Sequence, residues 1–441
     1  MEPEPEREAT GVSLRAYAVL LRGNRNLRRL WMAQIVSELG DWFYTLAIYT
    51  LLLQLTGKAS SVALALVLQV LPQTLIGPAA GVINDRIRRK HVMIAADLAR
   101  AAIVISMLLV RSPGQVWMIY PLLLLETIMA AFFEPARSSV IPNITTRENL
   151  VLANTLSSTT WSINLVMGAA VGGVVAAFLG RDAVFVLNAF SFLLSALLIR
   201  GMRFVEPHAE GAPPLRWRDL VDYSPVVQGI RYVRNDRRLV TTIFAKAAMF
   251  VIGPSWVIFT LMGQRDFPVR ARWIDPHGGA MLGMSLLMGA RGVGALLGPL
   301  LAAPWAGHIQ RRLQTAILVG LTIDALGYMA LGRASSIWLA CLAVTFAHCG
   351  GSTVWVFSTT LLQLNTDDHF RGRVFAADLG FSMFTIAVGA FLAGRFLDWG
   401  ASARAVATWA GLLMLPAVVL WAWAMRSWEA PGTSVSVEAA D

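Results

Sequence analysis

The stretch GVINDRIRRK, Gly81 to Lys90, decides how this chain folds. It joins two apolar runs, each about the 20 residues long that a helix needs to cross a bilayer. The link is too short to be a domain, and charges confined between two such helices indicate a loop at a membrane surface. Its charged residues are Asp85, Arg86, Arg88, Arg89 and Lys90.

The composition of the 441 residues agrees with a membrane protein. Hydrophobic residues make up 56% of the chain and charged residues only 15%, which is more apolar sequence than a soluble core absorbs. Backbone polar groups must be paired inside a bilayer, so these apolar segments are expected to be helices. The sequence predicts an all-α polytopic membrane protein with twelve transmembrane helices, at 30–53, 61–83, 91–110, 116–134, 150–179, 183–202, 239–262, 279–303, 314–332, 337–362, 374–397 and 402–425.

The net charge of +10 reflects membrane topology rather than nucleic-acid binding. With the N-terminus placed in the cytoplasm, roughly two thirds of the 37 lysine and arginine residues fall on the cytoplasmic side, as the positive-inside rule requires. We therefore predict a multi-pass protein with both termini in the cytoplasm. The first apolar run has no small-residue cleavage site after it, so we expect no removable signal peptide.

The chain is expected to divide into two halves around a polar segment. Three short matches recur in the same order in both halves and support two parallel six-helix repeats: Asn26–Leu30 with Asn235–Leu239, Gly77–Gly81 with Ala303–Gly307, and Ala153-Asn154 with Ala377-Asp378. The predicted organisation is a cytoplasmic N-terminal segment (1–29), a six-helix bundle (30–202), a cytoplasmic central loop with an amphipathic helix (203–238), a second six-helix bundle (239–426) and a cytoplasmic tail (427–441).

The pattern Gly-x-x-x-Asp-Arg-x-x-Arg-Lys between the second and third spans resembles the signature loop of the major facilitator superfamily of secondary transporters. Within that superfamily the chain looks most similar to the bacterial branch of enterobactin-type siderophore exporters and macrolide-efflux proteins. The resemblance implies the major facilitator fold, with a substrate site near the membrane midplane between the repeats. The motifs that carry it are Gly40-Asp41-Trp42, FFEPARSSVIP (Phe132 to Pro142) with Ala153-Asn154, LNAFSFLLSALL (Leu187 to Leu198) and Arg371-Gly372-Arg373-Val374.

Some positions depart from the family pattern. The glycine usual at the eighth position of the loop is Arg88 here, and Arg311 stands in the second half where Asp85 stands in the first. Span five also lacks the Gly-Pro bend that exporters of this type often have, which weakens the inference of an antiporter.

In the family, the loop acid and basic residues hold the two halves together at the cytoplasmic face. The resemblance thus implies a conformational latch, in which Asp85 could meet the N-terminal end of span eleven and its helix dipole. Glu134, at the end of span four, is a candidate partner for the loop arginines. The alternative is a charge cluster that only sets topology. The predicted latch residues are Gly81, Asp85, Arg86, Arg89, Lys90 and Glu134.

A polar stripe in span one points to proton coupling. Gln34, Glu38 and Asp41 lie on one helix face, and a charge near the bilayer centre costs several kcal/mol. Two acids one turn apart also repel, so a carboxylate there is suited to binding and releasing a proton. Glu126 in span four is a third candidate. The alternative is that an acid of span one pairs with Lys246 or Arg291.

Other polar residues within the spans are candidates for the substrate cavity: Gln34, Asn154, Trp161, Arg291, His348, Trp355 and Asp378. Each also has a structural alternative, because polar groups often join transmembrane helices. For Arg291 the expected alternative is a carboxylate partner. We expect Asp97 and Arg100 to form a structural i,i+3 pair outside the cavity, and Lys246 to snorkel toward the membrane surface.

We predict a secondary active transporter of a bacterial inner membrane, a proton-coupled exporter (antiporter) of amphipathic organic compounds such as drugs, macrolides or siderophores. The alternatives are a gradient-independent facilitator, a lipid or lysolipid transporter and, less favoured, a non-transporting sensor. An enzyme is disfavoured, because the chain has no phosphate-binding loop, no His/Cys metal cluster and no nucleophile–His pairing. The expected partners are a small amphipathic substrate, protons and lipid, with no nucleic acid, cofactor or metal, and the protein is expected to be a monomer.

Overall fold

The computed structural model describes residues 14–206, 209–210, 220, 223–270, 276–307 and 309–427. The described chain is helical, which confirms the predicted fold class. Most of the central loop's first part and the whole tail from 428 lie outside the described residues, so the domain boundaries predicted there stay predictions.

The first half contains five long helices, the last of which comprises two spans. A short helix that the sequence analysis did not predict, α1 (Leu14–Gly23), precedes them; it docks through Leu20 against the core. Asn24 caps the next helix by accepting a hydrogen bond from the Leu27 N–H at 2.9 Å. The helices are α2 (Arg25–Thr56), α3 (Ala59–Arg86), α4 (Arg89–Ser106), α5 (Ile119–Ile144) and α6 (Arg147–Arg200).

Helix α6 is two spans joined at a kink. Gly180 has φ 80° and ψ 170°, a backbone conformation open to glycine but strained for other residues. The kink falls between the predicted spans 150–179 and 183–202. Two short 3₁₀ turns, η1 (Met107–Leu109) and η2 (Pro113–Met118), connect α4 to α5.

The second half repeats this arrangement. Its first span is interrupted, because α8 and α9 are separated by the 3₁₀ turn η5. The amphipathic helix predicted in the central segment is present as α7. The elements are α7 (Ser224–Arg234), α8 (Arg237–Ala247), η5 (Ala248–Val251), α9 (Ile252–Leu261), η6 (Met262–Asp266), α10 (Pro276–Ala306), α11 (Gln310–Leu331), α12 (Ile337–Leu364), α13 (Asp368–Asp398) and α14 (Ala403–Ser427).

Nine helices within the described ranges are long and apolar enough to cross a membrane. They match nine predicted spans. The other three predicted spans coincide with α2, the first part of α6 and the run α8–η5–α9, which are helical over the predicted lengths. Glu38 and Asp41 lower the hydropathy of α2, and η5 shortens the last of these helices.

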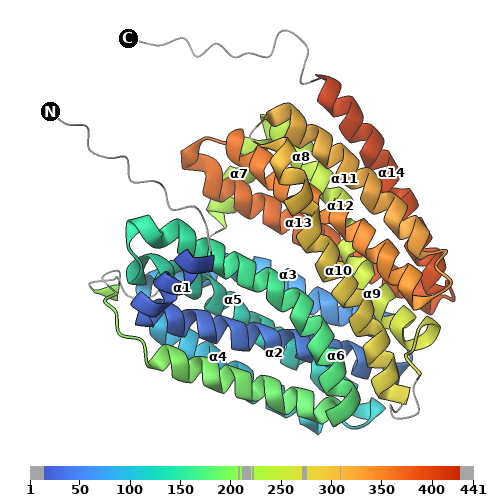
Figure 1. Ribbon diagram of the computed structural model, residues 1–441, viewed down its shortest axis with the longest axis horizontal. Helices are drawn as coiled ribbons and strands as arrows, with labels where there is room; N and C mark the ends of the chain where they lie inside the picture. Colours follow the sequence, from blue (N-terminus) through green and yellow to red (C-terminus); the bar gives the residue numbers. More distant parts are fainter. Residues whose placement is uncertain are drawn as a thin grey trace.

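The helices gather in two groups, α1–α6 and α7–α14 (Figure 1).

We call the end of the molecule that carries the α3–α4 link, Ile87–Arg88, the loop end, and the end that carries Gly57–Lys58 the far end. The two halves are tied together at the far end. Asp398 of α13 accepts hydrogen bonds from the backbone N–H groups of Ala59 (2.7 Å) and Ser60 (3.3 Å) at the start of α3.

Glycines let α10 and α12 approach closely. Gly294 and Gly298 lie one turn apart on α10, in a Gly-x-x-x-Gly pattern that permits close helix contact. A Cβ atom at Gly298 would overlap the carbonyl oxygen of Cys349, and one at Gly294 would overlap that of Thr345. No residue larger than glycine fits without a backbone shift.

We expect Gly298→Leu to lower the stability of the protein by at least about 1–3 kcal/mol, because the added side chain forces α10 away from α12. Gly289→Leu is the matched control on the same helix, since a Cβ atom there meets nothing within 4 Å. Thermal unfolding in detergent measures both variants. Equal melting temperatures for the two would show that the close contact does not matter for packing.

Candidate functional site

Arg100 of α4 is the centre of a buried ionic cluster. Its Nη2 donates to Asp41 Oδ2 of α2 at 2.7 Å, and its Nε donates to Glu126 Oε1 of α5 at 2.8 Å. Asp97 Oδ1, one turn earlier on α4, lies 4.0 Å from Nη1. The guanidinium also lies 4.0 Å from the ring centre of Phe192 on α6. Four spans of the first half therefore converge on one arginine.

The cluster holds three carboxylates and one cation among the described residues. The side chains of Asp97, Arg100 and Glu126 are each less than a tenth exposed, whereas that of Asp41 is 33% exposed. Three carboxylates around one buried cation leave the cluster with more negative than positive groups, and unpaired buried charges are costly.

Asp41 is exposed toward a cavity of about 270 Å³, which we call the central cavity. The ring of Trp42 stacks on that of Trp256 of α9, with centroids 5.8 Å apart and planes within 3°. This aromatic pair joins the two halves beside the acid cluster. The lining combines the cluster with aromatic and polar residues: Asp41, Trp42, Tyr44, Thr45, Tyr49, Leu66, Gln69, Val70, Gln73, Arg100, Glu126, Thr127, Ala130 and Trp256.

A larger apolar groove of about 880 Å³ lies between α3 and α13, under α7. Its walls include Leu71 and Leu75 of α3 and Phe381 and Phe384 of α13. Gln73 lines both this groove and the cavity, so the two spaces adjoin at one side chain.

Glu38 belongs to a separate network, one turn toward the loop end. Its carboxylate accepts hydrogen bonds from Gln34 Nε2 and from Asn164 Nδ2, both at 2.8 Å. Ser157 Oγ donates to Gln34 Oε1 and accepts from Arg137 Nη1. Gln34 is buried and holds Glu38, so the structure places it in this network and not in the lining of the central cavity.

Three of the predicted latch residues, Asp85, Arg89 and Lys90, make contacts within the first half in the part of the chain that the structure describes. The Asp85 side chain is 77% exposed and lies 3.7 Å from Arg89 on its own half. Arg89 donates to the carbonyl oxygens of Asn84 and Ser139, which are also in the first half. Lys90 Nζ donates to the carbonyl oxygen of Met202 at 2.6 Å. Gly81 lies in the last turns of α3, and Arg86 ends that helix. The side chain of Arg371, at the start of α13, lies outside the described residues.

Glu134, predicted as a partner of the loop arginines, forms its described ion pair within its own helix. Its partner is Arg137, one turn on in α5, at 2.7 Å. At i,i+3 the two side chains already lie on one face of their own helix. Arg137 thereby links Glu134 to the Glu38 network.

The second half has a buried ion pair of its own. Lys246 of α8 is 1% exposed; its Nζ lies 2.5 Å from Asp378 Oδ2 of α13 and donates to Thr359 Oγ1 of α12 at 2.9 Å. The ammonium also lies 4.8 Å from the ring centre of Trp355. The prediction that Lys246 snorkels is wrong, because a carboxylate and a hydroxyl from two neighbouring helices compensate the charge in place. Asp378 and Trp355 are thus partners of a lysine.

Arg291 and His348 lie in the interior of the second half. The Arg291 guanidinium lies 4.5 Å from the ring centre of Trp256, and its Nη1 is buried without a hydrogen-bond partner among the described residues. The ion pairs found in the described part of the chain do not include the carboxylate pair expected for Arg291. His348 is buried and lies 3.2 Å from the Tyr328 hydroxyl. Neither residue lines the central cavity. Asn154 and Trp161 lie on α6 with exposed side chains.

The sequence analysis missed Arg100, Arg137 and Asn164 as site residues. Arg100 was assigned to a structural pair outside the cavity, and this is wrong: it lines the cavity and binds Asp41 and Glu126. Arg137 stands within the FFEPARSSVIP motif, which was a usable signal. Among the residues that the structure describes, no group of three or more His, Cys, Asp or Glu side chains is arranged to hold a metal ion.

A family model described as transmembrane secretion effector matches residues 18–438. The chain belongs to this family. Transmembrane secretion effectors are transporters of the major facilitator superfamily rather than enzymes, and this one is a multi-pass membrane protein. The family resemblance that was inferred from the signature loop is thus confirmed.

Known proteins similar to this chain include ones named for macrolide efflux and for tetracycline resistance. Macrolide efflux protein A of Streptococcus pyogenes is 24% identical over 84% of this chain and 88% of its own length. The tetracycline resistance protein, class C, of Escherichia coli is 27% identical over 83% of this chain and 88% of its own. The crystal structure of the nucleoside transporter NupG covers 91% of this chain and 98% of its own at a TM-score of 0.67 and 12% identity, a likeness of fold alone.

Proposed function

We propose that the protein is a proton-coupled exporter (antiporter) of amphipathic organic compounds that works by alternating access. The observation that carries the proposal is the Arg100 cluster at the edge of the cavity. Its three carboxylates share one cation, so the number of protons that they hold decides the net charge beside the substrate space. A cationic or polar substrate entering the cavity would compete with those protons, and such competition is the basis of antiport.

The substrate class is supported by the shape and chemistry of the two adjoining spaces. Trp42, Tyr49 and Trp256 offer aromatic faces near carboxylates, while the groove between α3 and α13 is lined almost entirely by apolar side chains. A molecule with an apolar body and a polar or cationic group fits this pair of spaces. The similar proteins named for macrolide efflux and for tetracycline resistance support an organic compound as the substrate.

The proposed function also requires a definite orientation in the membrane. The loop end would face the cytoplasm of a bacterial cell with both termini on that side, in keeping with the distribution of lysine and arginine. The two six-helix bundles would rock about the cavity, and Asp85 would meet the second half only when the loop end closes. The far end is tied together here, so the present conformation would be open toward the loop end.

Transport into proteoliposomes with an imposed pH gradient tests the function, using a fluorescent amphipathic cation as substrate. We expect gradient-driven movement by the intact protein and movement at background level for Asp41→Asn, because that variant removes a carboxylate that contacts both Arg100 and the cavity. Asp182→Asn is the matched control: this acid lies 46% exposed near the far end, bonded to Arg111.

Each outcome separates the candidate functions. Loss in Asp41→Asn alone supports proton coupling at the cluster. Movement that ignores the gradient in every variant would instead favour a facilitator or a lipid transporter, for which the lateral apolar groove is the supporting observation. Normal gradient-driven transport by Asp41→Asn would refute the assignment of this carboxylate.

A further inference from the structure

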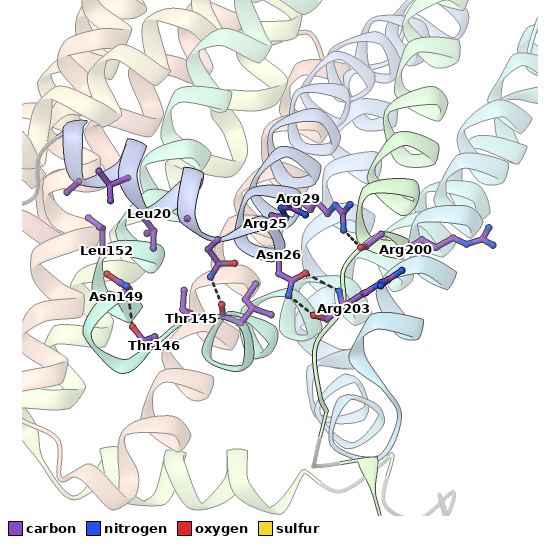
Figure 2. A pocket seen from close by; sticks show the side chains of 16 residues that line it. Leu20, Arg25, Asn26, Arg29, Thr145, Thr146, Asn149, Leu152, Arg200 and Arg203 are labelled. Atoms are coloured by element: carbon purple, nitrogen blue, oxygen red, sulfur yellow. Dashed lines mark hydrogen bonds between the residues drawn. The ribbon is translucent and has the colours of Figure 1, made fainter.

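A third space, a pocket of about 1650 Å³, opens at the loop end of the first half, away from the central cavity. Figure 2 shows it between α1, the start of α2, the α5–α6 link and the end of α6. No aspartate or glutamate is among the described residues that line it. Its basic residues are Arg25, Arg29, Arg200 and Arg203.

Hydrogen bonds between distant segments hold the walls in place. Asn26 Nδ2 donates to the carbonyl oxygen of Arg203 at 2.6 Å, and the Arg203 N–H donates to Asn26 Oδ1 at 3.0 Å. Arg29 Nη1 donates to the carbonyl oxygen of Gly201. Asn24 Nδ2 donates to the carbonyl oxygen of Ile144 at 2.5 Å. The arginines thus project from a fixed frame instead of a loose surface loop.

The chemistry of the pocket suits a phosphate ester. The start of α6 lines it at Thr146, whose side chain makes no capping hydrogen bond, so the helix N-terminus adds its partial positive charge to that of the arginines. In Figure 2 the side chains of Arg200 and Arg203 extend outward from the wall of the pocket.

The opposite side of the pocket is apolar. Val19 and Leu20 of α1 and Leu152 of α6 line it, and Figure 2 shows Leu20 and Leu152 across the pocket from the arginines. A basic side and an apolar side next to the membrane surface match a lipid, which carries both an anionic headgroup and acyl chains. A small soluble anion would leave the apolar side without a partner.

We propose that this pocket binds an anionic phospholipid from the leaflet at the loop end, with its phosphodiester among Arg25, Arg29 and Arg203. The bound lipid steadies the link Gly201–Glu206, and this link holds the signature loop. Lys90 Nζ donates to the Met202 carbonyl oxygen, and the Lys90 N–H donates to Glu206 Oε1 at 3.3 Å. The site therefore connects lipid composition to the position of the loop, independently of what the protein transports.

Lipid retention in nanodiscs tests the binding. Nanodiscs of phosphatidylcholine with a minor fraction of phosphatidylglycerol are prepared with the full chain, and retained phosphatidylglycerol is counted by native mass spectrometry. We expect the double variant Arg25→Gln/Arg203→Gln to reduce retention by about tenfold or more. The control Arg22→Gln/Arg28→Gln removes the same charge from exposed neighbours on α1 and α2 that do not line the pocket, and it should retain the lipid.

The control and two further arms make each part of the proposal refutable. An equal loss in both double variants would show general attraction to a basic surface and overturn the site, as would no loss in either. Displacement of the lipid by soluble glycerol phosphate would assign the pocket to a free phosphate ester instead. Hydrogen exchange of the link 201–206 should slow when phosphatidylglycerol is present and not slow in the pocket variant; the same exchange in both lipids would overturn the coupling to the signature loop.

Discussion

Replacing Arg100 with glutamine is expected to abolish gradient-driven transport and to destabilise the first half. The substitution removes the only cation that the described structure places within 4 Å of Asp41, Asp97 and Glu126. Leaving buried charges without a partner costs about 3–5 kcal/mol when one side of an ion pair is deleted. Transport in proteoliposomes and thermal unfolding of the same preparation measure the two effects.

Two companion variants separate charge from geometry at this position. Arg100→Lys keeps the cation, yet a lysine cannot donate from two fixed nitrogens to acids on two different helices, as the guanidinium does. We expect it to fold with near-normal stability and to transport poorly. Asp97→Asn added to Arg100→Gln should recover part of the lost stability, because it removes one uncompensated carboxylate, without restoring transport. Normal transport by Arg100→Gln would contradict the central role of the cluster.

The fold could be predicted from the sequence because its signals are local. Apolar length and the charged link Gly81–Lys90 fix the spans, and a helix in a bilayer satisfies its own backbone. The same local signals separated the two spans that meet at the Gly180 kink, and they predicted the amphipathic helix that the structure shows as α7. Helix α1 was missed because a short amphipathic helix at the surface has neither the length nor the hydropathy of a span.

The pairings within the site could not be predicted, because helical periodicity describes one helix at a time. The i,i+3 spacing correctly brought Asp97 near Arg100, but it carries no information on the faces that α2 and α5 turn toward that arginine. Lys246 was expected to snorkel because its distance from the helix end was known and its facing carboxylate, Asp378, was not. Which carboxylate meets which cation depends on the tertiary packing of spans that are distant in the sequence. Lys246 and Asp378, for example, are 132 residues apart.

The latch illustrates a different limit. A loop that contacts the second half in one conformation and not in another has a single sequence but two sets of partners. Asp85 is exposed in the conformation described here, with the far end tied by Asp398. The family resemblance implies contacts with the second half, whereas the contacts described for Arg89 and Lys90 lie within the first half.

Lys246→Met is expected to lower the melting temperature sharply, whereas Lys246→Met/Asp378→Leu should recover most of the loss. The single substitution leaves the buried Asp378 carboxylate without its cation, at a cost of about 3–5 kcal/mol, and the double substitution replaces the whole pair with apolar side chains of similar size. Thermal unfolding of Lys246→Met, Asp378→Leu and the double variant completes the cycle. A double variant as unstable as the sum of its two single variants would show that the pair does not act as a unit.

The same variants decide whether the second half takes part in coupling. Its pair is balanced, one cation to one carboxylate, and it joins α8, α12 and α13 through Thr359 and Asp378. The Arg100 cluster instead holds more carboxylates than cations and opens to the cavity. If protons act only at the unbalanced cluster, the double variant should restore gradient-driven transport together with stability. Restored stability without transport would place a second coupling group at Asp378 and would divide proton handling between the two halves.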